Sequence, residues 1–420
     1  MTALPGERKP GSAARVVLLL SAAAFINYVD RGTLATAGPL IRDEFGLSNT
    51  QLGVLLSAFF WSYAPSQLPA GWLAERLDAR RVLAAGLALW GIATLLAGFA
   101  TGFLMLLLLR LLLGVGESVM YPASFKVLAV EAQEAARGRA CGFLASGLHL
   151  GAAFGVFAGA LAMARFGWRV FFIGAGMASL LWLWPWLRTP RIERSAHELT
   201  SVTGPPTLTL LARPELWLGC LGHFCAAYSL YLVISWLPTY LVQAQGFSMA
   251  MVAPLGATVY LLAALCGVLT GWLSDRRIAA GADGNRVRKT VMLTAFLGLA
   301  VGFTICALAG RWGSVVGMAE CGVSLGIATA GIYIYVQSLA GPGAAARWMA
   351  VQNFCGNIAG ISAPLVTGFV ADRTGGFAAA FLLAAALAVV GLLAVCVLLR
   401  RIEPVDWARA AQSPAARLRG

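Results

Sequence analysis

The sequence contains little charge for its length. Asp, Glu, Lys and Arg make up 12% of its 420 residues, whereas hydrophobic residues make up 59% and the mean hydropathy is +0.78. A water-soluble domain typically carries about 25% charged residues, because charge must cover its surface. The scarcity of charge therefore excludes a water-soluble globular protein and indicates that most of the surface faces lipid.

Residues that bind metals or build disulfide frameworks are also few. The chain has three histidines and eight cysteines; every cysteine lies in an apolar stretch, and none is spaced like a metal ligand. We interpret the cysteines as small core residues and expect no metal, no cofactor and no disulfide. No nucleophile–base pair, metal cluster or phosphate-binding loop is recognisable. An enzyme or a receptor is therefore the weakest of the function classes considered.

The sequence instead offers a series of long apolar segments. About 20 apolar residues cross the hydrocarbon core of a bilayer as a helix. The first apolar run continues through Asp30 and Arg31, so it is interpreted as a span and not as a cleavable signal. The pattern predicts an all-α, polytopic membrane protein with twelve transmembrane helices near 15–39, 51–74, 82–100, 103–125, 141–163, 169–187, 214–241, 251–274, 290–310, 313–339, 348–371 and 377–399.

The basic residues are distributed unevenly between the two sides of the membrane. With an even number of spans, both termini lie on one side, and the loops of that side hold 24 of the 31 Lys and Arg. The opposite loops hold five, and the other two, Arg31 and Arg110, lie inside spans. Basic loops are typical of the cytoplasmic side. We therefore predict a multi-pass protein of the inner (plasma) membrane with both termini cytoplasmic, and we attribute the net charge of +13 to topology and not to a nucleic-acid partner.

The sequence repeats itself weakly at an offset of 200 positions. GWLAER at 71–76 is matched by GWLSDR at 271–276, and Gly46-Leu47-Ser48 is matched by Gly246-Phe247-Ser248. Duplicated six-helix halves with a solute site at their interface are a transporter architecture. The predicted organisation is an N-terminal half at 1–188, a cytoplasmic linker at 189–213, a C-terminal half at 214–400 and a cytoplasmic tail at 401–420.

The first copy of the repeated motif carries a family resemblance. GWLAERLDARR at 71–81 resembles the loop signature of the major facilitator superfamily, with Glu75 where Asp is usual and Asp78 where Gly is usual. The resemblance implies the major facilitator fold, in which the glycine allows close helix approach and the acid and arginines hold the loop to helix ends in one conformational state. The residues concerned are Gly71, Glu75, Arg76, Arg80 and Arg81 in the first copy and Asp275 and Arg276 in the second.

Three further segments resemble the anion:cation symporter family, which includes bacterial galactonate and hexuronate transporters and animal sialic-acid and vesicular glutamate transporters. They are NYVDR at 27–31, RLLLGVGES at 110–118 with Pro122, and SWLPTYL at 235–241. The resemblance implies proton-coupled uptake of a small organic anion, such as a sugar acid or another carboxylate, by alternating access. A same-fold exporter, for drugs, or an anion exchanger is the alternative. We expect the chain to act as a monomer in the lipid membrane.

Ionisable residues inside the spans are functional candidates, because each costs at least about 2.5–3.5 kcal/mol at mid-bilayer. Asp30 and Glu117 are the predicted proton carriers, since burial favours a neutral carboxyl group and the resemblance assigns the same role to these positions. Arg31 is predicted to bind the substrate carboxylate with its guanidinium fork. Arg110 shares a helix face with Glu117 and is a further binding candidate. The alternatives are a structural ion pair of Asp30 with Arg110 and neutralisation of Asp30 by Arg31.

Other polar side chains in the spans are candidates for substrate binding. The resemblance implies that Tyr28 and Tyr63 line the cavity, although both could simply pack between helices. Asn353 and Asn357 lie four residues apart, on one helix face, and amides inside a membrane bond to a ligand or across helices. His149 belongs to the site or is a core histidine.

Some positions depart from the pattern of sugar-acid carriers. Leu148 stands where galactonate-type carriers have glutamine, and His223 and Ala227 replace residues that are more often Tyr and Asn. Fewer groups that recognise hydroxyls favour a less hydroxylated carboxylate, short or aromatic. Glu320 is interpreted as a second proton site, as a contact for an amino-bearing substrate, or as a residue near the periplasmic end of its span.

Overall fold

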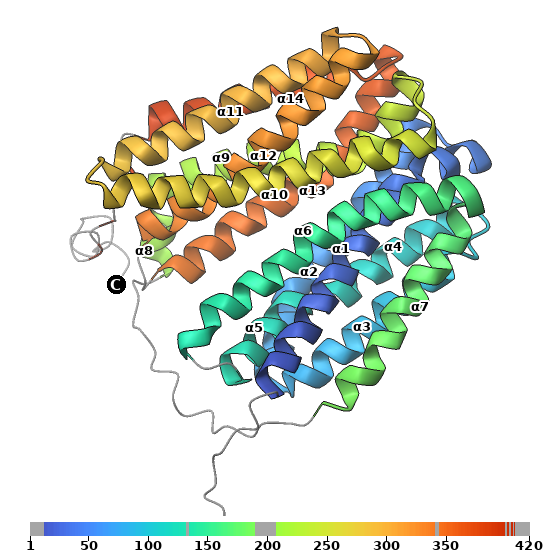
Figure 1. Cartoon of the computed structure of the whole chain (residues 1–420), viewed down its shortest axis with the longest axis horizontal. Helices are drawn as coiled ribbons and strands as arrows, with labels where there is room; N and C mark the ends of the chain where they lie inside the picture. Colours follow the sequence, from blue (N-terminus) through green and yellow to red (C-terminus); the bar gives the residue numbers. More distant parts are fainter. Residues whose placement is uncertain are drawn as a thin grey trace, which may run out of the picture. The chain divides into compact units, whose positions relative to one another are not determined.

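The computed structural model describes residues 12–131, 134–189, 207–340 and 344–399, and the single residues 401, 402, 405 and 407. Nearly all of them are helical, and no strand occurs among them (Figure 1). The first helices are α1 (Ser12–Phe45), α2 (Asn49–Arg76), α3 (Ala79–Ala97), α4 (Phe103–Glu117), α5 (Met120–Glu131), α6 (Glu134–Phe166) and α7 (Trp168–Leu187).

The second series follows residue 206. It consists of the short α8 (Thr207–Leu211), then α9 (Pro214–Thr239) with the π-helical η2 (Tyr240–Ala244), α10 (Met249–Ala279), α11 (Gly284–Leu308), α12 (Arg311–Ala340), α13 (Ala345–Thr374) and α14 (Ala378–Leu392) with the π-helical η3 (Leu393–Leu398). Each η segment continues the helix before it, and α4 and α5 are separated only by Ser118 and Val119. The helices therefore follow the twelve predicted segments.

The helices extend beyond the predicted spans. The first span was predicted at 15–39, but α1 has 34 residues, which is about 50 Å at 1.5 Å per residue. Hydropathy marks only the part of a helix inside the hydrocarbon core, about 30 Å thick, and not its continuation through the interface. Among the described residues, ten helical segments are long and apolar enough to cross a membrane; α2 is not one of them, and only Leu150–Phe166 of α6 forms a shorter apolar helix.

The same helix pairings occur twice along the chain. In the first series, α1 packs on α6, and α3 packs on both α4 and α7. In the second series, α9 packs on α13, and α11 packs on both α12 and α14. Counting predicted spans from α1 and from α9, with α4 and α5 as one span, these are the same three pairings. The all-α fold class with two six-helix repeats is therefore confirmed.

Spatial proximity divides the chain into two compact units. Unit 1 comprises 1–47, 58–199 and 249–253, and unit 2 comprises 48–57, 200–248 and 254–420. Within unit 2, the carboxylate of Asp372 near the end of α13 accepts hydrogen bonds from the backbone N–H groups of Asn49 and Thr50, at 3.0 and 2.6 Å. Residues 190–206 and most of 401–420 lie outside the described residues, so the linker at 189–213 and the tail at 401–420 stay predictions.

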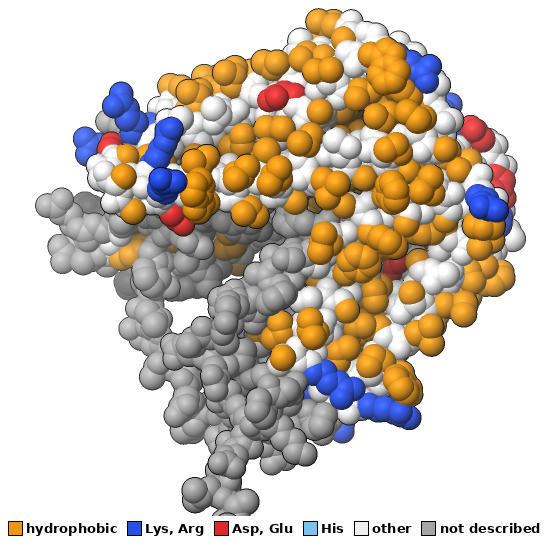
Figure 2. Space-filling view, viewed as in Figure 1, with side chains coloured by type: hydrophobic (Ala, Val, Ile, Leu, Met, Phe, Trp, Pro, Cys, Tyr) orange, Lys and Arg blue, Asp and Glu red, His pale blue; other side chains and the backbone are white. Residues whose placement is uncertain are grey.

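Large apolar side chains project from the helices instead of being buried. Leu68 is 81% exposed, Val268 73% and Leu308 74%. In Figure 2, hydrophobic side chains cover the visible face of α10 and α11, whereas Lys and Arg gather at the ends of these helices. Apolar faces of this extent are stable in lipid and not in water. The chain is therefore a multi-pass membrane protein.

A close crossing in unit 1 brings α2 against α4. A Cβ atom added to Gly114 would lie 2.4 Å from the carbonyl oxygen of Phe59 and 2.3 Å from Oγ of Ser62. Ser62 Oγ also donates a hydrogen bond to the carbonyl of Leu111 on α4 at 2.7 Å. Small residues permit such backbone approach between membrane helices. The crossing holds the middle of α2 next to the end of α4.

Gly114→Ala is therefore expected to destabilise the protein by about 1–3 kcal/mol, because the new methyl group must displace backbone atoms. Thermal unfolding of the purified protein in detergent measures this loss. Gly174→Ala on α7 is the matched control: its methyl group meets nothing within 4 Å, and alanine is the better helix former. Equal unfolding temperatures for both variants would contradict the proposed crossing.

Candidate functional site

An ion pair between α1 and the end of α4 lies at the centre of unit 1. Arg31 Nε donates to Glu117 Oε2 at 2.8 Å, and the side chains are 13% and 0% exposed. Glu117 is the last residue of α4, directly before the two-residue break that separates α4 from α5. The structure thus joins two of the predicted site residues that lie 86 positions apart in the sequence.

Aromatic rings surround the Arg31 guanidinium. Its Cζ atom lies 5.0 Å from the ring centroid of Tyr28, 4.9 Å from that of Phe59 and 4.6 Å from that of Tyr63. Phe59 and Tyr63 stack on each other with centroids 4.9 Å apart. Rings at this distance stabilise a cation through their π electrons. Arg31 is thus held by one carboxylate and three rings.

Phe59 was missed by the sequence reasoning, which searched for polar groups. It contacts both buried cations, because Arg110 also lies over its ring, at 5.4 Å. The available signal was its position one helical turn before Tyr63, which places both rings on one face of α2. The crossing at Gly114 then brings that face against α4.

One nitrogen of Arg31 is left without a partner. Nη2 is buried and makes no hydrogen bond to any described residue. An unmet buried donor costs free energy, more so on a charged group. Arg31 therefore presents a donor that a bound anion could satisfy.

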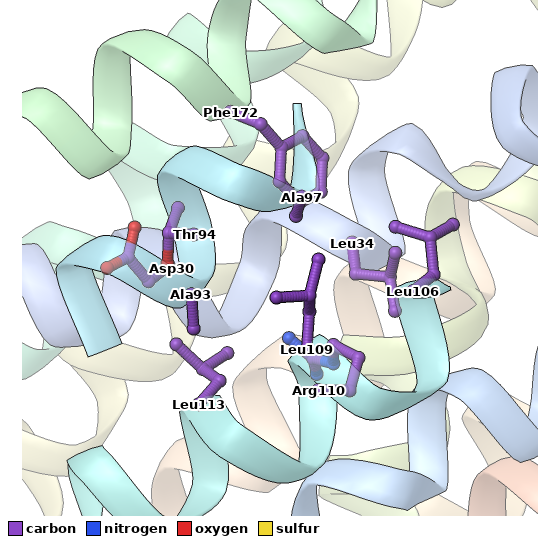
Figure 3. Close-up of a pocket in the computed structure, with 10 residues that line it drawn as sticks. All are labelled: Asp30, Leu34, Ala93, Thr94, Ala97, Leu106, Leu109, Arg110, Leu113 and Phe172. Atoms are coloured by element: carbon purple, nitrogen blue, oxygen red, sulfur yellow. The ribbon is translucent and has the colours of Figure 1, made fainter. Parts of the chain in front are cut away.

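Asp30 and Arg110 line a separate, small cavity between α1, α3, α4 and α7 (Figure 3). Both residues are almost completely buried, at 2% and 7% exposure. Ser179 Oγ on α7 donates to Asp30 Oδ2 at 3.2 Å, and Thr94 on α3 lies beside the same carboxylate. The cavity offers about 10 Å³, roughly the space that one water molecule needs. It is too small for an organic solute.

The four buried charges form one electrostatic group. Asp30 interacts with both Glu117 and Arg110, and Glu117 interacts with both arginines. With all four side chains ionised, two negative and two positive charges balance. Burying unbalanced charge is costly in a low dielectric. A change of charge at one member therefore affects the other three.

The arrangement bears on the alternatives considered for Asp30. Arg31 pairs with Glu117 and not with its neighbour Asp30, and adjacent residues of a helix point about 100° apart. In the described chain, Asp30 and Arg110 share a cavity without forming an ion pair. The predicted proton-carrying roles of Asp30 and Glu117 stay predictions, as does substrate binding by Arg31, Arg110, Tyr28 and Tyr63.

In unit 2, the candidate residues do not gather into one cluster. On α13, Asn353 is exposed and Asn357 is buried, with its Nδ2 atom lacking a described partner. His223 on α9 packs its ring next to Gly356. Glu320 is half-buried and accepts a hydrogen bond from Ser324, one turn later on α12, at 3.0 Å.

Two predicted positions can be described only in part. His149 lies on α6, but its side chain is outside the described residues, as is that of Glu75 on α2. Their proposed roles stay predictions. Glu320 is the tenth residue of α12, about 14 Å from the helix start. The interpretations given for it stay predictions.

The loop motif between α2 and α3 is built around a helix cap. Asp78 is the N-cap of α3 and accepts from the backbone N–H of Arg80 at 3.0 Å, which gives a physical reason for Asp where Gly is usual. Arg80 donates to the carbonyl of Thr189 and stacks over Trp186, so it ties this loop to the end of α7. Arg81 approaches Asp78 at 3.8 Å and is exposed.

Neither motif glycine has a close neighbour among the described residues, so the predicted close helix approach stays a prediction. A Cβ atom at Gly71 or Gly271 would have no described heavy atom within 4 Å. The arginines that follow do repeat their contacts, since Arg76 lies over Trp72 at 4.8 Å and Arg276 over Trp272 at 5.2 Å. Asp275 is exposed.

Two six-helix repeats, lipid-facing outer surfaces and a buried charge cluster define a membrane transporter. The family profile of the major facilitator superfamily matches residues 20–361 and 278–418. The chain belongs to the major facilitator superfamily, and it is a transporter and not an enzyme.

Curated relatives confirm the predicted resemblance to anion transporters. The chain is 31% identical over 392 residues to a probable sulfoacetate transporter of Cupriavidus necator, covering 88% of this chain and 90% of that protein. It is 30% identical over 428 residues to a D-galactonate transporter of Escherichia coli, with coverage of 94% and 98%. A hexuronate transporter of Bacillus subtilis is 29% identical over 403 residues, with coverage of 93% and 94%.

Solved structures of the superfamily share the fold. A bacterial homologue of the human lysosomal transporter Spinster, in an inward-facing and occupied conformation, matches with a TM-score of 0.79 at 18% identity, over 97% of this chain and 98% of that one. The nucleoside transporter NupG matches with a TM-score of 0.75 at 15% identity, over 92% and 100%.

Arg110→Leu is expected to destabilise the protein by several kcal/mol, because it leaves Asp30 and Glu117 with a single buried cation. Adding Asp30→Asn to this variant should recover part of the loss by removing one negative charge. Thermal unfolding in detergent measures both effects, and Arg165→Leu at the exposed end of α6 serves as the control, with little expected change. Simple additivity of the Asp30 and Arg110 substitutions would contradict the electrostatic coupling.

Proposed function

We propose that this protein is a secondary active transporter that takes up a small organic anion together with protons by alternating access. The observation that carries this proposal is the buried Arg31, which is paired with Glu117 through Nε and whose Nη2 has no hydrogen-bond partner among the described residues. A carboxylate is a chemical group whose geometry such a guanidinium matches. The transport of anions by the curated relatives supports the same class of solute.

Proton coupling follows from the charge balance of the cluster. A solute anion at Arg31 adds its negative charge to a group whose two acids and two arginines already balance. A proton on Glu117 offsets one such charge and releases Arg31 for the solute, and a solute with two ionised acid groups needs a second proton for full neutrality. The loaded state therefore contains the anion and protons together. A loaded site without net charge also has the lowest free-energy cost in the low-dielectric interior of the protein.

The solute is proposed to be short and poorly hydroxylated. Leu148 and Ala227 offer no hydrogen bonds where sugar-acid carriers have polar residues, and the three rings around Arg31 present mainly apolar surface. Sulfoacetate, the compound for which the relative from Cupriavidus necator is named, has an acid group at each end and no hydroxyl. It is therefore the first compound to test, beside D-galactonate as the hydroxylated comparison.

The decisive experiment is uptake of labelled anion into proteoliposomes with an imposed inward proton gradient. We expect accumulation above equilibrium that collapses on addition of a protonophore. Glu117→Gln should lose this accumulation, because a neutral side chain cannot take up the proton, yet retain exchange of internal for external anion. Asp43→Asn, an exposed carboxylate near the end of α1, is the control and should accumulate normally.

Accumulation driven by the gradient in Glu117→Gln at the wild-type level would remove Glu117 from the proposal. Efflux driven by an inward proton gradient would favour the same-fold exporter. Exchange that needs no proton gradient in the wild type would favour an anion exchanger.

Arg31→Ala is expected to weaken anion binding at least about 30-fold, because a buried charge-assisted pair is worth 2 kcal/mol or more. Isothermal titration calorimetry of the purified protein with the anion measures the affinity. Arg31→Lys should bind with intermediate affinity, since an ammonium group keeps the charge without the fork. Arg31→Ala leaves the buried Glu117 without its ion-pair partner. The double variant Arg31→Ala/Glu117→Gln removes that buried charge and therefore controls for misfolding. An affinity equal to that of the wild type would place the anion elsewhere.

A further inference from the structure

A second, unrelated cavity opens at one end of unit 2. It has a volume of about 450 Å³ and lies where the start of α11 meets the π-helical turn η3. Its lining residues are Asp283, Asn285, Arg286, Lys289, Thr290, Leu293 and Cys396. It contains none of the residues assigned to solute or proton binding.

The cavity is basic. Arg286 and Lys289 line it, and neither forms an ion pair with a carboxylate of the described residues. The one acid among the described lining residues, Asp283, is the N-cap of α11, and its Oδ1 atom accepts a hydrogen bond from the backbone N–H of Asn285 at 3.0 Å. Figure 2 shows Lys and Arg side chains gathered where α10 ends and α11 begins, which is the region of the cavity. The cavity therefore suits an anion.

The walls of the cavity are held in place by backbone contacts. Lys289 Nζ donates to the carbonyl of Cys396 in η3 at 3.2 Å. Asn285 Oδ1 accepts the N–H of Ile402 at 2.9 Å, and Arg288 donates to the carbonyl of the same residue at 3.1 Å. These bonds tie the segment after α14 to the first turns of α11. The cavity is thus pre-formed and not a gap between loose ends.

Apolar side chains lead away from the cavity along both helices. Leu293, Leu297 and Val301 lie at intervals of four residues on α11 and are 44–54% exposed. Val389, Leu393 and Val397 have the same spacing on α14 and η3 and are 45–60% exposed. Because α11 packs on α14, the two stripes lie on neighbouring helices. Eight residues of helix extend about 12 Å, most of one leaflet of the hydrocarbon core.

We propose that this cavity binds the phosphate of an anionic phospholipid of the cytoplasmic leaflet, with the acyl chains lying on the stripes of α11 and α14. A basic pocket between helices on the cytoplasmic side is a recognised form of lipid headgroup site, and the predicted topology places these basic loops on that side. A free phosphate ion would use Arg286 and Lys289 equally well but would gain nothing from the stripes. The lipid is therefore the favoured source of the phosphate.

The test measures the affinity of the purified full-length protein for dioctanoyl phosphatidylglycerol, by native mass spectrometry and by the shift in unfolding temperature. Each cation near a membrane surface contributes roughly a fivefold factor in binding to anionic lipid. We therefore expect Arg286→Gln to weaken binding about fivefold and Arg286→Gln/Lys289→Gln roughly 30-fold. Arg286 has an exposed side chain, so the single variant tests the site even if the double variant folds poorly.

Matched probes distinguish the sources of the anion. Dioctanoyl phosphatidylcholine should bind much more weakly, because it carries no net charge, and inorganic phosphate should give no comparable stabilisation. Arg276→Gln/Arg277→Gln removes two exposed charges at the end of α10, outside the cavity, and should weaken binding much less than the double variant in the cavity. Equal binding of both lipids, equal stabilisation by phosphate, or an equal loss in the α10 variant would each overturn the proposal.

Discussion

Unit 1 depends on the balance of four charges that are largely buried from solvent. Asp30 and Arg31 on α1 and Arg110 and Glu117 on α4 are all buried or nearly so, and a lone charge there would cost several kcal/mol. Charge balance thus requires the two helices to remain together, with the ion pair between Arg31 and Glu117 as their direct link. The close crossing of α2 and α4 at Gly114 supplies the rings that complete the surroundings of Arg31.

The duplicated fold repeats the packing but not the charges. At the offset of 200 positions, Asp30 and Arg31 on α1 correspond to Leu230 and Tyr231 on α9. The helix pairings α1 with α6 and α9 with α13 are nevertheless equivalent. The second repeat therefore keeps the interhelical contacts that make a six-helix bundle and leaves the ionic chemistry to the first. In unit 2, Asn357, His223 and Glu320 offer isolated polar groups and no second ion-pair cluster among the described residues.

The sequence was sufficient for the fold class and for the inventory of buried charges, because hydropathy and charge each depend on composition over one span. It was not sufficient for the partners. The sequence suggested two partners for Asp30: its neighbour Arg31 and the oppositely charged Arg110. The ion pair that forms instead joins Arg31 to Glu117, 86 positions away. That choice is made by helix packing, which depends on contacts such as Ser62 with Leu111. Phe59 escaped notice because apolar residues are abundant in every span.

The two buried acids occupy different surroundings, so their proposed roles cannot be interchangeable. Glu117 contacts Arg31 directly and competes with any solute anion for the same guanidinium. Asp30 accepts a hydrogen bond from Ser179 and lines, with Arg110, the small cavity that has room for about one water molecule. It also borders a larger, mainly apolar pocket of about 320 Å³ between α1, α6 and α7. Its link to the Arg31 site is electrostatic, by way of Arg110, whose guanidinium lies over the same Phe59 ring as Arg31. Under the proposed mechanism, Glu117 exchanges its proton with solute binding, and Asp30 sets the electrostatic balance in which that exchange occurs.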